Sequence, residues 1–409
     1  METQGRSIPP LRSLTLDLPP SCIEFCPGQP EYFVVGTYNL QRGSEDPGTV
    51  AGVDEETDQQ ATKSVQTRDG SLILFKLTGA DEIQLVQTVP YPSAILDLHF
   101  HPGREGCTVL AVVSSTGTLS FFRLSSSEGS QISLKEIITH RPLDVEEGIL
   151  FLSCSWHPHI PELLAITTSD YQVHIIQVDD FWNVHQTSTE PVITHTLEAW
   201  TVAFSPLKPR DFQQLTIFSG GDDSKLFARK YAFNPKRICG EDDSIETLYS
   251  PISIRGHEAG VTAILPLDIQ FDSLNSVVIT GSYDDHIRVF AIYDNDVILS
   301  NAGLLAEENL QGGVWRLKLI DLQKTIREKE GDRWTALILA SCMHAGSRIL
   351  EITGETETRS CDIKVLGRFE EHKSMNYGSD FQPGSEKGGR KLRCISTSFY
   401  DRLLCLWEY

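Results

Sequence analysis

Short runs of alternating apolar and polar residues recur along most of this 409-residue chain. A period of two is typical of half-buried β-strands. In residues 280–290, TGSYDDHIRVF, a polar turn around Asp284 separates two such runs. Similar segments surround Asp223 (SGGDDSKLF) and Asp401 (TSFYDRLLCLW). The pattern predicts an all-β chain built from one small repeated unit, which cannot bury its own faces and must pack against its neighbours.

A histidine precedes each of these aspartates at a nearly constant distance. The pairs, 27 to 29 residues apart, are His195 with Asp223, His257 with Asp284, and His372 with Asp401. This arrangement resembles the WD-repeat family, whose Gly-His and Trp-Asp signatures mark the four-stranded blades of a β-propeller. Strand patterns group into seven such units. We therefore expect a seven-bladed WD-repeat β-propeller that occupies residues 1–409 as a single domain.

The two ends of the chain predict how the ring closes. The seventh unit stops at Tyr409 without a fourth strand, and residues 14–18 form a strand pattern that no unit uses. We expect this N-terminal strand to complete the last blade, because closure protects sheet edges that would otherwise be exposed. Residues 41–70 of the first unit are polar and almost free of large apolar side chains. They are predicted to be a disordered acidic insertion, with a regulatory or docking tail as the alternative.

Composition and charge narrow the function classes. The chain contains 40% hydrophobic residues and carries a formal net charge of -21. The acidic balance disfavours nucleic-acid binding, which depends on Lys and Arg, and it does not identify a cationic partner. The N-terminus has no signal or transit pattern, and no apolar run approaches the ~20 residues of a membrane span. The nine scattered cysteines include no C-x-x-C pair. We expect a cytoplasmic monomer with reduced thiols, no metal and no cofactor.

The His/Asp pairs allow a catalytic and a structural interpretation. His257, Ser282 and Asp284 contain the residue types of a Ser-His-Asp catalytic set. The same types recur in two further units, whereas a catalytic site seldom appears several times in one chain. We therefore interpret the pairs as hydrogen-bond networks inside the blades.

The sixth unit departs from the pattern. It has Cys342 and His344 where the other units have serine and aspartate, and Gln311-Gly312-Gly313 where they have histidine. A Cys/His pair can supply a nucleophile and a base, but alternate residues of a strand and turn can equally be packing residues. Both interpretations remain open at this point.

The beginnings of the innermost strands predict a binding site at the channel mouth. Trp200, Trp315 and Tyr377 come from three units and would face one another, flanked by Glu198 and Asp380. Aromatic rings beside acidic groups suit a quaternary ammonium ion. The alternative is that these rings fill the channel or bind a side chain of a partner protein.

Longer motifs resemble a particular family. They are spread in order along the chain as GTYNL (36–40), SAILDL (93–98), LEAWTVAF (197–204), QGGVWRLK (311–318), ASCMHAGSRIL (340–350) and YGSDF (377–381). These motifs resemble the diphthine methyl ester hydrolases of diphthamide synthesis. The resemblance implies hydrolysis of the methyl ester of methylated diphthine on elongation factor 2, which yields diphthine and methanol. The trimethylammonium group of that substrate is the cation expected at the mouth.

The resemblance and the residues together define a candidate site. The expected catalytic residues are His344, Cys342 and Glu198. The expected substrate-binding residues are Trp200, Gly312, Gly313, Trp315, Arg316, Tyr377 and Asp380. His344 would be the general base toward water, and the amides of the two glycines would donate to the oxyanion. The rival interpretation is a non-catalytic WD-repeat scaffold that docks elongation factor 2 and enzymes of the same pathway.

Overall fold

The computed structural model describes most of the chain as strands and tight connections. The described residues are 5–41, 67–79, 81–103, 105–126, 132–208, 214–234, 243–271, 275–294, 299–325, 332–355, 360–385 and 391–409. They form no α-helix, and hence no helix of the length and apolarity needed to cross a membrane.

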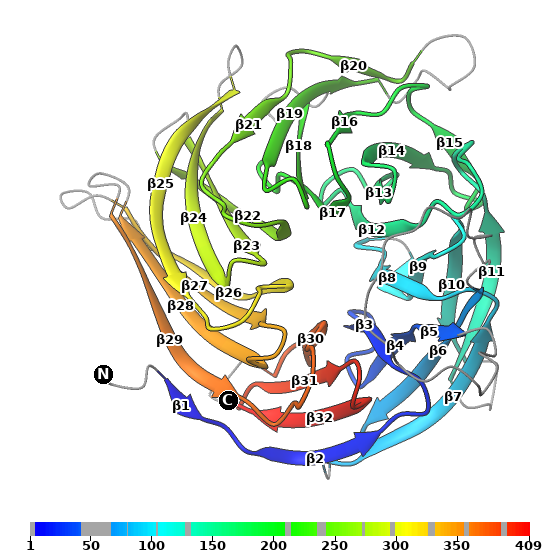
Figure 1. Cartoon of the computed structure of the whole chain (residues 1–409). Helices are drawn as coiled ribbons and strands as arrows, with labels where there is room; N and C mark the ends of the chain where they lie inside the picture. The colour runs from blue at the N-terminus through cyan, green and yellow to red at the C-terminus, as the bar shows by residue number, and fades with distance from the viewer. Residues whose placement is uncertain are drawn as a thin grey trace, which may run out of the picture.

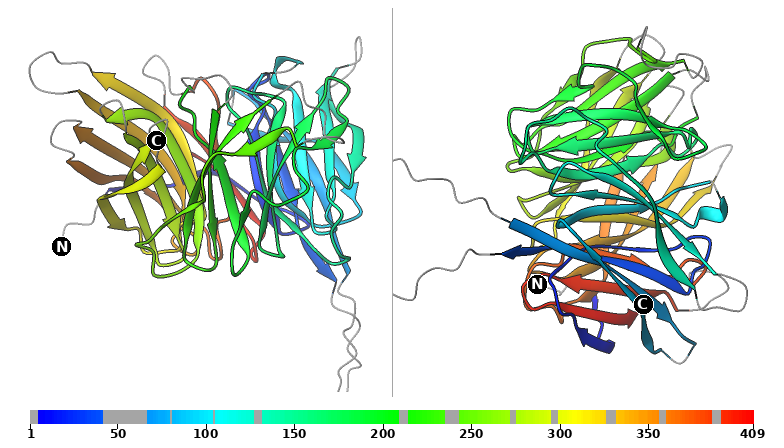
Figure 2. Two further views of the ribbon diagram at one scale, coloured as in Figure 1. Left: turned by 90° about the horizontal axis from the view of Figure 1, so that it is seen from above. Right: turned by 90° about the vertical axis from the view of Figure 1, so that its right-hand side faces the viewer.

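Seven antiparallel sheets stand around a central channel as the blades of a β-propeller (Figure 1). The side views show the blades side by side, with strands running between the two faces of the ring (Figure 2). The innermost strands contact one another around the channel. The predicted fold class is confirmed.

The first four blades follow the chain from the N-terminal third to the middle. Blade 1 contains β3 (Pro20–Phe25), β4 (Tyr32–Thr37), β6 (Thr67–Leu77) and β7 (Ile83–Tyr91), with β5 (Asn39–Gln41) beside β6. Blade 2 contains β8 (Ile95–Phe100), β9 (Val109–Ser114), β10 (Leu119–Ser125) and β11 (Ser133–His140). Blade 3 contains β12 (Phe151–Trp156), β13 (Leu163–Thr168), β14 (Gln172–Val178), β15 (Val184–Gln186) and β16 (Ile193–Thr194). Blade 4 contains β17 (Ala199–Phe204), β18 (Gln214–Gly221), β19 (Leu226–Phe233), β20 (Ile245–Thr247) and β21 (Ile252–Ile254).

The last three blades include the strands from the N-terminus. Blade 5 contains β22 (Val261–Phe271), β23 (Asn275–Ser282), β24 (His286–Asp294) and β25 (Leu299–Asn309). Blade 6 contains β26 (Arg316–Thr325), β27 (Arg333–Ser341), β28 (Ser347–Glu355), β29 (Cys361–Phe369) and β1 (Arg6–Ser7). Blade 7 contains β30 (Gly378–Phe381), β31 (Arg393–Ser398), β32 (Leu403–Glu408) and β2 (Pro10–Thr15).

The N-terminal strand closes the ring as expected, but it begins earlier than residue 14. Strand β2 pairs antiparallel with β32, from Pro10 opposite Trp407 to Thr15 opposite Leu403. Most of β2 is exposed, so the alternation of apolar residues could not define its ends. Strand β1, which the sequence did not predict, adds a second closure by pairing parallel with β29 of blade 6.

The predicted insertion at 41–70 is too long at both ends. Gln41 belongs to β5, and residues 67–70 belong to β6. The sequence has no apolar pattern there. The two strands are instead held by backbone pairing and by a 2.7 Å hydrogen bond from Asn39 Nδ2 to Asp69 Oδ1. Residues 42–66, on which the rest of this prediction rests, lie outside the described residues.

The core lies between neighbouring blades rather than at one centre. One apolar cluster joins blades 5 and 6 through residues such as Val289 and Ile338, and another joins blades 1 and 2 through Val34 and Val112. The eight described cysteines are unpaired, and six of them belong to such apolar clusters. The blades are therefore held together by apolar burial, which dominates the energetics of folding.

The histidine networks differ from blade to blade. In blade 4, His195 contacts both Asp223 Oδ1 (3.0 Å) and Ser219 Oγ (2.9 Å). In blade 5, His257 bonds Thr280 at 2.8 Å instead of Ser282. In blade 7, His372 Nε2 lies 2.7 Å from Ser396 Oγ, whereas Asp401 accepts hydrogen bonds from Ser398 and Ser374. The expected triads are therefore wrong in blades 5 and 7, where the aspartate accepts hydrogen bonds from other residues than the histidine: Arg288 and the amide of Glu258 in blade 5, and Ser374 and Ser398 in blade 7.

We expect His257→Ala to lower the free energy of unfolding by roughly 1–3 kcal/mol. The imidazole is neutral because burial lowers its pKa to about 4, and it bonds the hydroxyl of Thr280 inside the blade. Its loss leaves a cavity and an unpaired hydroxyl group. Denaturant unfolding measures the effect, with His185→Ala as the control because the His185 side chain is 40% exposed on β15. An equal midpoint for the two variants would contradict a structural role for His257.

Candidate functional site

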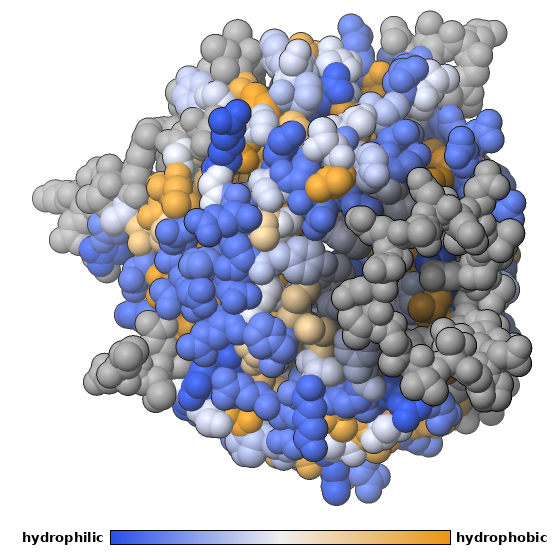
Figure 3. All heavy atoms as spheres, viewed as in Figure 1, coloured by the Kyte–Doolittle hydropathy of each residue, from blue (hydrophilic) through white to orange (hydrophobic). Residues whose placement is uncertain are grey.

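The channel opens at the centre of the ring, and the space-filling view shows a hollow there (Figure 3). Trp200 is the second residue of β17, whereas Trp315 and Tyr377 directly precede the innermost strands β26 and β30. Tyr283 lies in the turn from β23 to β24. Starts of innermost strands and these turns occur at the same end of the blades, so the four rings gather at one mouth.

The four rings form a continuous series that we call the aromatic arc: Trp200, Tyr283, Trp315 and Tyr377. The centroid of the Trp315 ring lies 5.7 Å from that of Trp200, 5.8 Å from Tyr283 and 5.0 Å from Tyr377. Trp200 and Tyr283 are 6.3 Å apart and nearly perpendicular. The arc continues through Phe399, 5.6 Å from Tyr377. The structure thus brings the three rings named from the sequence into one cluster and adds Tyr283.

An acidic side chain that the sequence analysis missed adjoins the arc. Asp222 Oδ1 accepts a 3.1 Å hydrogen bond from Nε1 of Trp200. The backbone amide of Asp222 donates to the carbonyl oxygen of Glu198 at 2.8 Å. Glu198 is partly exposed, and only its backbone contributes to this turn. The sequence feature that could have revealed Asp222 is the doubled aspartate of SGGDDSKL. Only Asp223 of this pair contacts His195, which leaves Asp222 without a role in that network.

The loop with the two glycines packs against the turn that carries His344. A Cβ atom added at Gly312 would lie 2.3 Å from the carbonyl oxygen of Cys342, and one at Gly313 would lie 2.8 Å from Sδ of Met343. Only glycine permits this approach. In the described part of the chain, the amide nitrogens of these glycines have no hydrogen-bond acceptor. His344 is exposed between Met343 and Ala345 in the same turn.

The structure contradicts Cys342 as a nucleophile. The side chain is fully buried in the apolar cluster between blades 5 and 6. Burial raises the pKa of its thiol to about 12, so the reactive thiolate is not formed near neutral pH. Cys342 is therefore a core residue. Of the two interpretations of the Cys/His pair, packing is the correct one for the cysteine.

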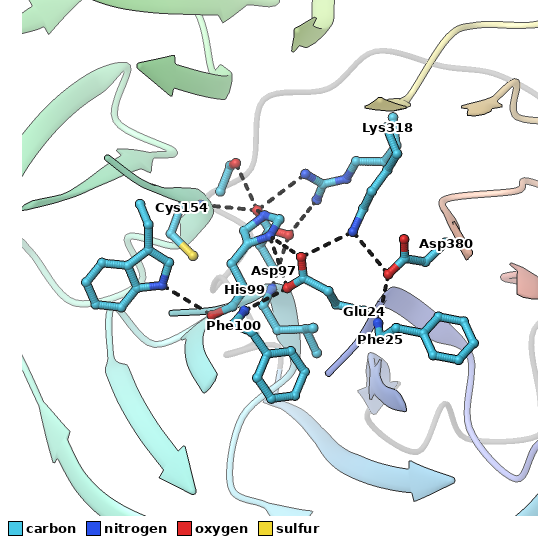
Figure 4. Close-up of polar contacts among 12 residues, drawn as sticks. Glu24, Phe25, Asp97, His99, Phe100, Cys154, Lys318 and Asp380 are labelled. Atoms are coloured by element: carbon cyan, nitrogen blue, oxygen red, sulfur yellow. Dashed lines mark hydrogen bonds and ion pairs between the residues drawn. The ribbon is translucent and has the colours of Figure 1, made fainter. Parts of the chain in front are cut away.

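Below the mouth, charged side chains from four blades form an ion network across the channel (Figure 4). Arg316 Nη2 of blade 6 lies 2.8 Å from Asp97 Oδ1 of blade 2. Asp97 also accepts hydrogen bonds from Ser153 Oγ (2.9 Å) and the backbone amide of Cys154 (3.1 Å) in blade 3. The guanidinium of Arg316, which was expected to bind substrate, is therefore directed at an aspartate across the channel.

Lysine and histidine connect the other members of the network. Lys318 Nζ lies 3.2 Å from both Glu24 Oε1 and Asp380 Oδ2. His99 lies between two carboxylates, with Nδ1 3.3 Å from Glu24 and Nε2 3.4 Å from Asp97. Asp380 also accepts the backbone amide of Phe25 at 2.7 Å. The prediction that Asp380 flanks the aromatic rings is wrong, because its carboxylate is occupied inside the channel.

The pKa values of the network follow from burial and charge acting in opposite directions. Burial alone would raise the pKa of Glu24, but Lys318 and His99 outweigh it and lower the pKa to about 2. Burial would lower the pKa of His99, but Asp97 and Glu24 raise it to about 9. At Asp380 burial dominates over Lys318 and raises the pKa. His99 is therefore a cation at neutral pH and not a general base.

The raised pKa of His99 predicts how stability depends on pH. The pKa of His99 is about 9 in the folded state against an ordinary 6.5. Protonated His99 therefore contributes its full stabilisation of the fold below pH ~6.5, and this contribution is lost as the pH rises through 9. We expect the difference in unfolding free energy between the wild type and His99→Gln to shrink from about pH 6 to about pH 10. Denaturant titrations of both proteins measure it, and a difference independent of pH would contradict a charged His99.

Comparison with known proteins places the chain among WD-repeat propellers. Residues 249–290 match the family model "WD domain, G-beta repeat". The crystal structure of Sqt1 from Chaetomium thermophilum superposes with a TM-score of 0.53 over 95% of this chain and 82% of that one, at 13% identity, and supports the fold alone. The chain is a WD-repeat β-propeller protein.

Whole-length relatives identify the family more closely. "Diphthine methyltransferase homolog" of Dictyostelium discoideum is 24% identical and covers 96% of this chain and 97% of its own. "Diphthine methyltransferase" of Schizosaccharomyces pombe is 28% identical over 85% of this chain and 87% of its own, and that of Homo sapiens is 27% identical over 91% and 74%. The chain is thus similar along most of its length to proteins named diphthine methyltransferase, in agreement with the diphthamide-synthesis resemblance of its motifs.

Proposed function

We propose that this protein acts in diphthamide biosynthesis by hydrolysing the methyl ester of methylated diphthine on elongation factor 2. The observation that carries the proposal is the aromatic arc at the channel mouth of a chain similar to diphthine methyltransferases. Such a cluster suits a trimethylammonium group, because aromatic faces attract a weakly hydrated cation. The relatives' name describes methyl transfer. In the proposed reaction, water is the attacking group and the methyl group leaves in methanol.

The proposed reaction uses the turn and loop of blade 6. With the trimethylammonium group on the arc, water attacks the carbonyl carbon of the ester, and His344 accepts a proton from that water. The amides of Gly312 and Gly313 donate to the carbonyl oxygen as it becomes negative. The tetrahedral adduct expels the methoxy group, which takes the proton from His344 and leaves as methanol. The acid that remains ionises to the carboxylate of diphthine.

The unoccupied amides support this assignment. Buried backbone amides normally have acceptors, and Gly312 and Gly313 lack one among the described residues. They stand beside the turn of His344, with Tyr283 close to Gly313. A proton acceptor, two amide donors and a cation site are thus adjacent, as ester hydrolysis requires. Glu198 remains a second candidate for the base because it lies at the same mouth.

Mass spectrometry of methyl-esterified elongation factor 2 incubated with the purified protein in oxygen-18 water tests the proposal. We expect the methyl group to be replaced by hydrogen, methanol to be released and heavy oxygen to enter the carboxylate. Loss of the methyl group without heavy oxygen would favour methyl transfer. Binding of elongation factor 2 without any change of mass would favour the non-catalytic scaffold.

A further inference from the structure

Two consecutive aspartates in the turn from β18 to β19 have different surroundings. Asp223 lies 3.0 Å from His195 and 3.8 Å from the ammonium group of Lys225, so its carboxylate has partners in its own blade. Asp222 accepts the N–H of Trp200, but no Lys, Arg or His nitrogen of the described chain pairs with its carboxylate. A carboxylate without a cation therefore lies at the edge of the aromatic arc.

The position of this carboxylate is defined on three sides. Its backbone amide is bound to Glu198, and its side chain is bound to Trp200. On the third side, a Cβ atom at Gly260 would lie 2.7 Å from Asp222 Oδ1 and 3.0 Å from Cδ2 of Tyr283. Glycine at this position thus lets the carboxylate and the Tyr283 ring approach the same point. Asp222 is held between two members of the arc.

The rings around Asp222 present their faces in different directions. The interplanar angles are 84° for Trp200 and Tyr283, 60° for Trp200 and Trp315, and 46° for Tyr283 and Trp315. With centroids separated by 5.7 to 6.3 Å, a cation above this triangle lies within about 6 Å of all three rings. A lysine ammonium has three N–H groups that need acceptors, whereas a quaternary ammonium has none. One carboxylate among three rings therefore fits the quaternary ion better.

We propose that Asp222 is the counter-ion of the arc and makes it select a trimethylammonium group over a neutral group of the same shape. This inference rests on the proposed function, since it specifies how the site recognises that part of the substrate. It also assigns the role expected of Glu198 and Asp380 to a different residue. The carboxylate acts through charge, and its hydrogen bond orients the Trp200 ring.

Choline and its neutral carbon analogue, 3,3-dimethylbutanol, separate charge from shape. Titration calorimetry with the full chain measures the affinity for each. We expect Asp222→Asn to weaken choline binding about five- to tenfold, the effect of one nearby charge at a partly solvated site. The asparagine oxygen still accepts the N–H of Trp200, so the affinity for the neutral analogue is expected to stay unchanged. Glu258→Gln is the matched control, because Glu258 is an exposed acid three residues before β22, the innermost strand of the next blade.

Two outcomes overturn the counter-ion role: unchanged choline affinity in Asp222→Asn, or an equal loss in Glu258→Gln. An equal loss for both probes in Asp222→Asn would also overturn it, since shape and not charge would then have changed. The result is separable from the proposed function. Selective choline binding without ester hydrolysis would refute only the proposed enzymatic activity. Ester hydrolysis with binding that does not depend on charge would refute only the counter-ion role of Asp222.

Discussion

Replacing Asp97 by alanine is expected to lower the free energy of unfolding by about 3–5 kcal/mol, the largest stability effect that the structure predicts. The side chain of Asp97 is 2% exposed and compensates Arg316 and His99 across the channel. Removing it leaves the Arg316 guanidinium without its carboxylate and leaves His99 with Glu24 alone. It also removes the acceptor of the Ser153 hydroxyl and the Cys154 amide. An unpaired buried charge costs more than the original pair contributes, so the loss exceeds that of an ordinary surface ion pair.

Chemical denaturation of the wild type and the variant measures this effect, provided that the two proteins show the same dependence of unfolding free energy on denaturant concentration. Asp97→Asn keeps the shape and one acceptor oxygen, and it provides a milder variant if alanine prevents folding. The double variant Asp97→Ala/Arg316→Ala is expected to lose less than the sum of the single losses, because the second change removes the unpaired guanidinium. A loss below about 1 kcal/mol in Asp97→Ala would mean that water screens the network as it does at a surface.

The blades were predictable because their evidence is local. The alternation around Asp284 and Asp401, and the histidines ahead of them, depend on residues close in the chain. Strand β2 shows the limit, since an exposed outer strand needs no apolar pattern and its ends follow only from pairing with β32. The same applies to β5, where backbone pairing determines the strand.

The site was predictable only where position along a strand determines position in the ring. Trp200, Trp315 and Tyr377 were placed together because each lies at the start of an innermost strand. Asp380 lies three residues beyond Tyr377, and its carboxylate turns to Lys318 and Phe25 instead. Such a choice depends on partners from other blades, which the local pattern does not specify. Asp222 was missed because only the folded turn of its own blade brings it to Trp200.

The turn of His344 is rigid although its side chain is exposed. The amide of Ala345 donates to Cys342 at 2.8 Å, and Asn376 of the next blade donates its amide to the carbonyl of Met343 at 3.0 Å. Arg348 Nη1 donates to the carbonyl of Ala345 at 2.7 Å. These bonds use the backbone and leave the imidazole free of partners among the described residues. A fixed turn that carries an imidazole without a partner fits the proposed proton transfer from a bound water to His344.

Replacing His344 by alanine is accordingly expected to lower kcat for the methylated diphthine ester by about 10²–10⁴-fold while KM stays nearly unchanged. The arc, and not His344, holds the trimethylammonium group in this mechanism, so the loss falls on the chemical step. The variant should fold normally, because the side chain is exposed and its turn is bonded through the backbone. Mass spectrometry of the ester at several substrate concentrations separates kcat from KM, with His185→Ala as the exposed-histidine control. A normally folded His344→Ala protein with full kcat would exclude it as the base and direct the same assay to Glu198.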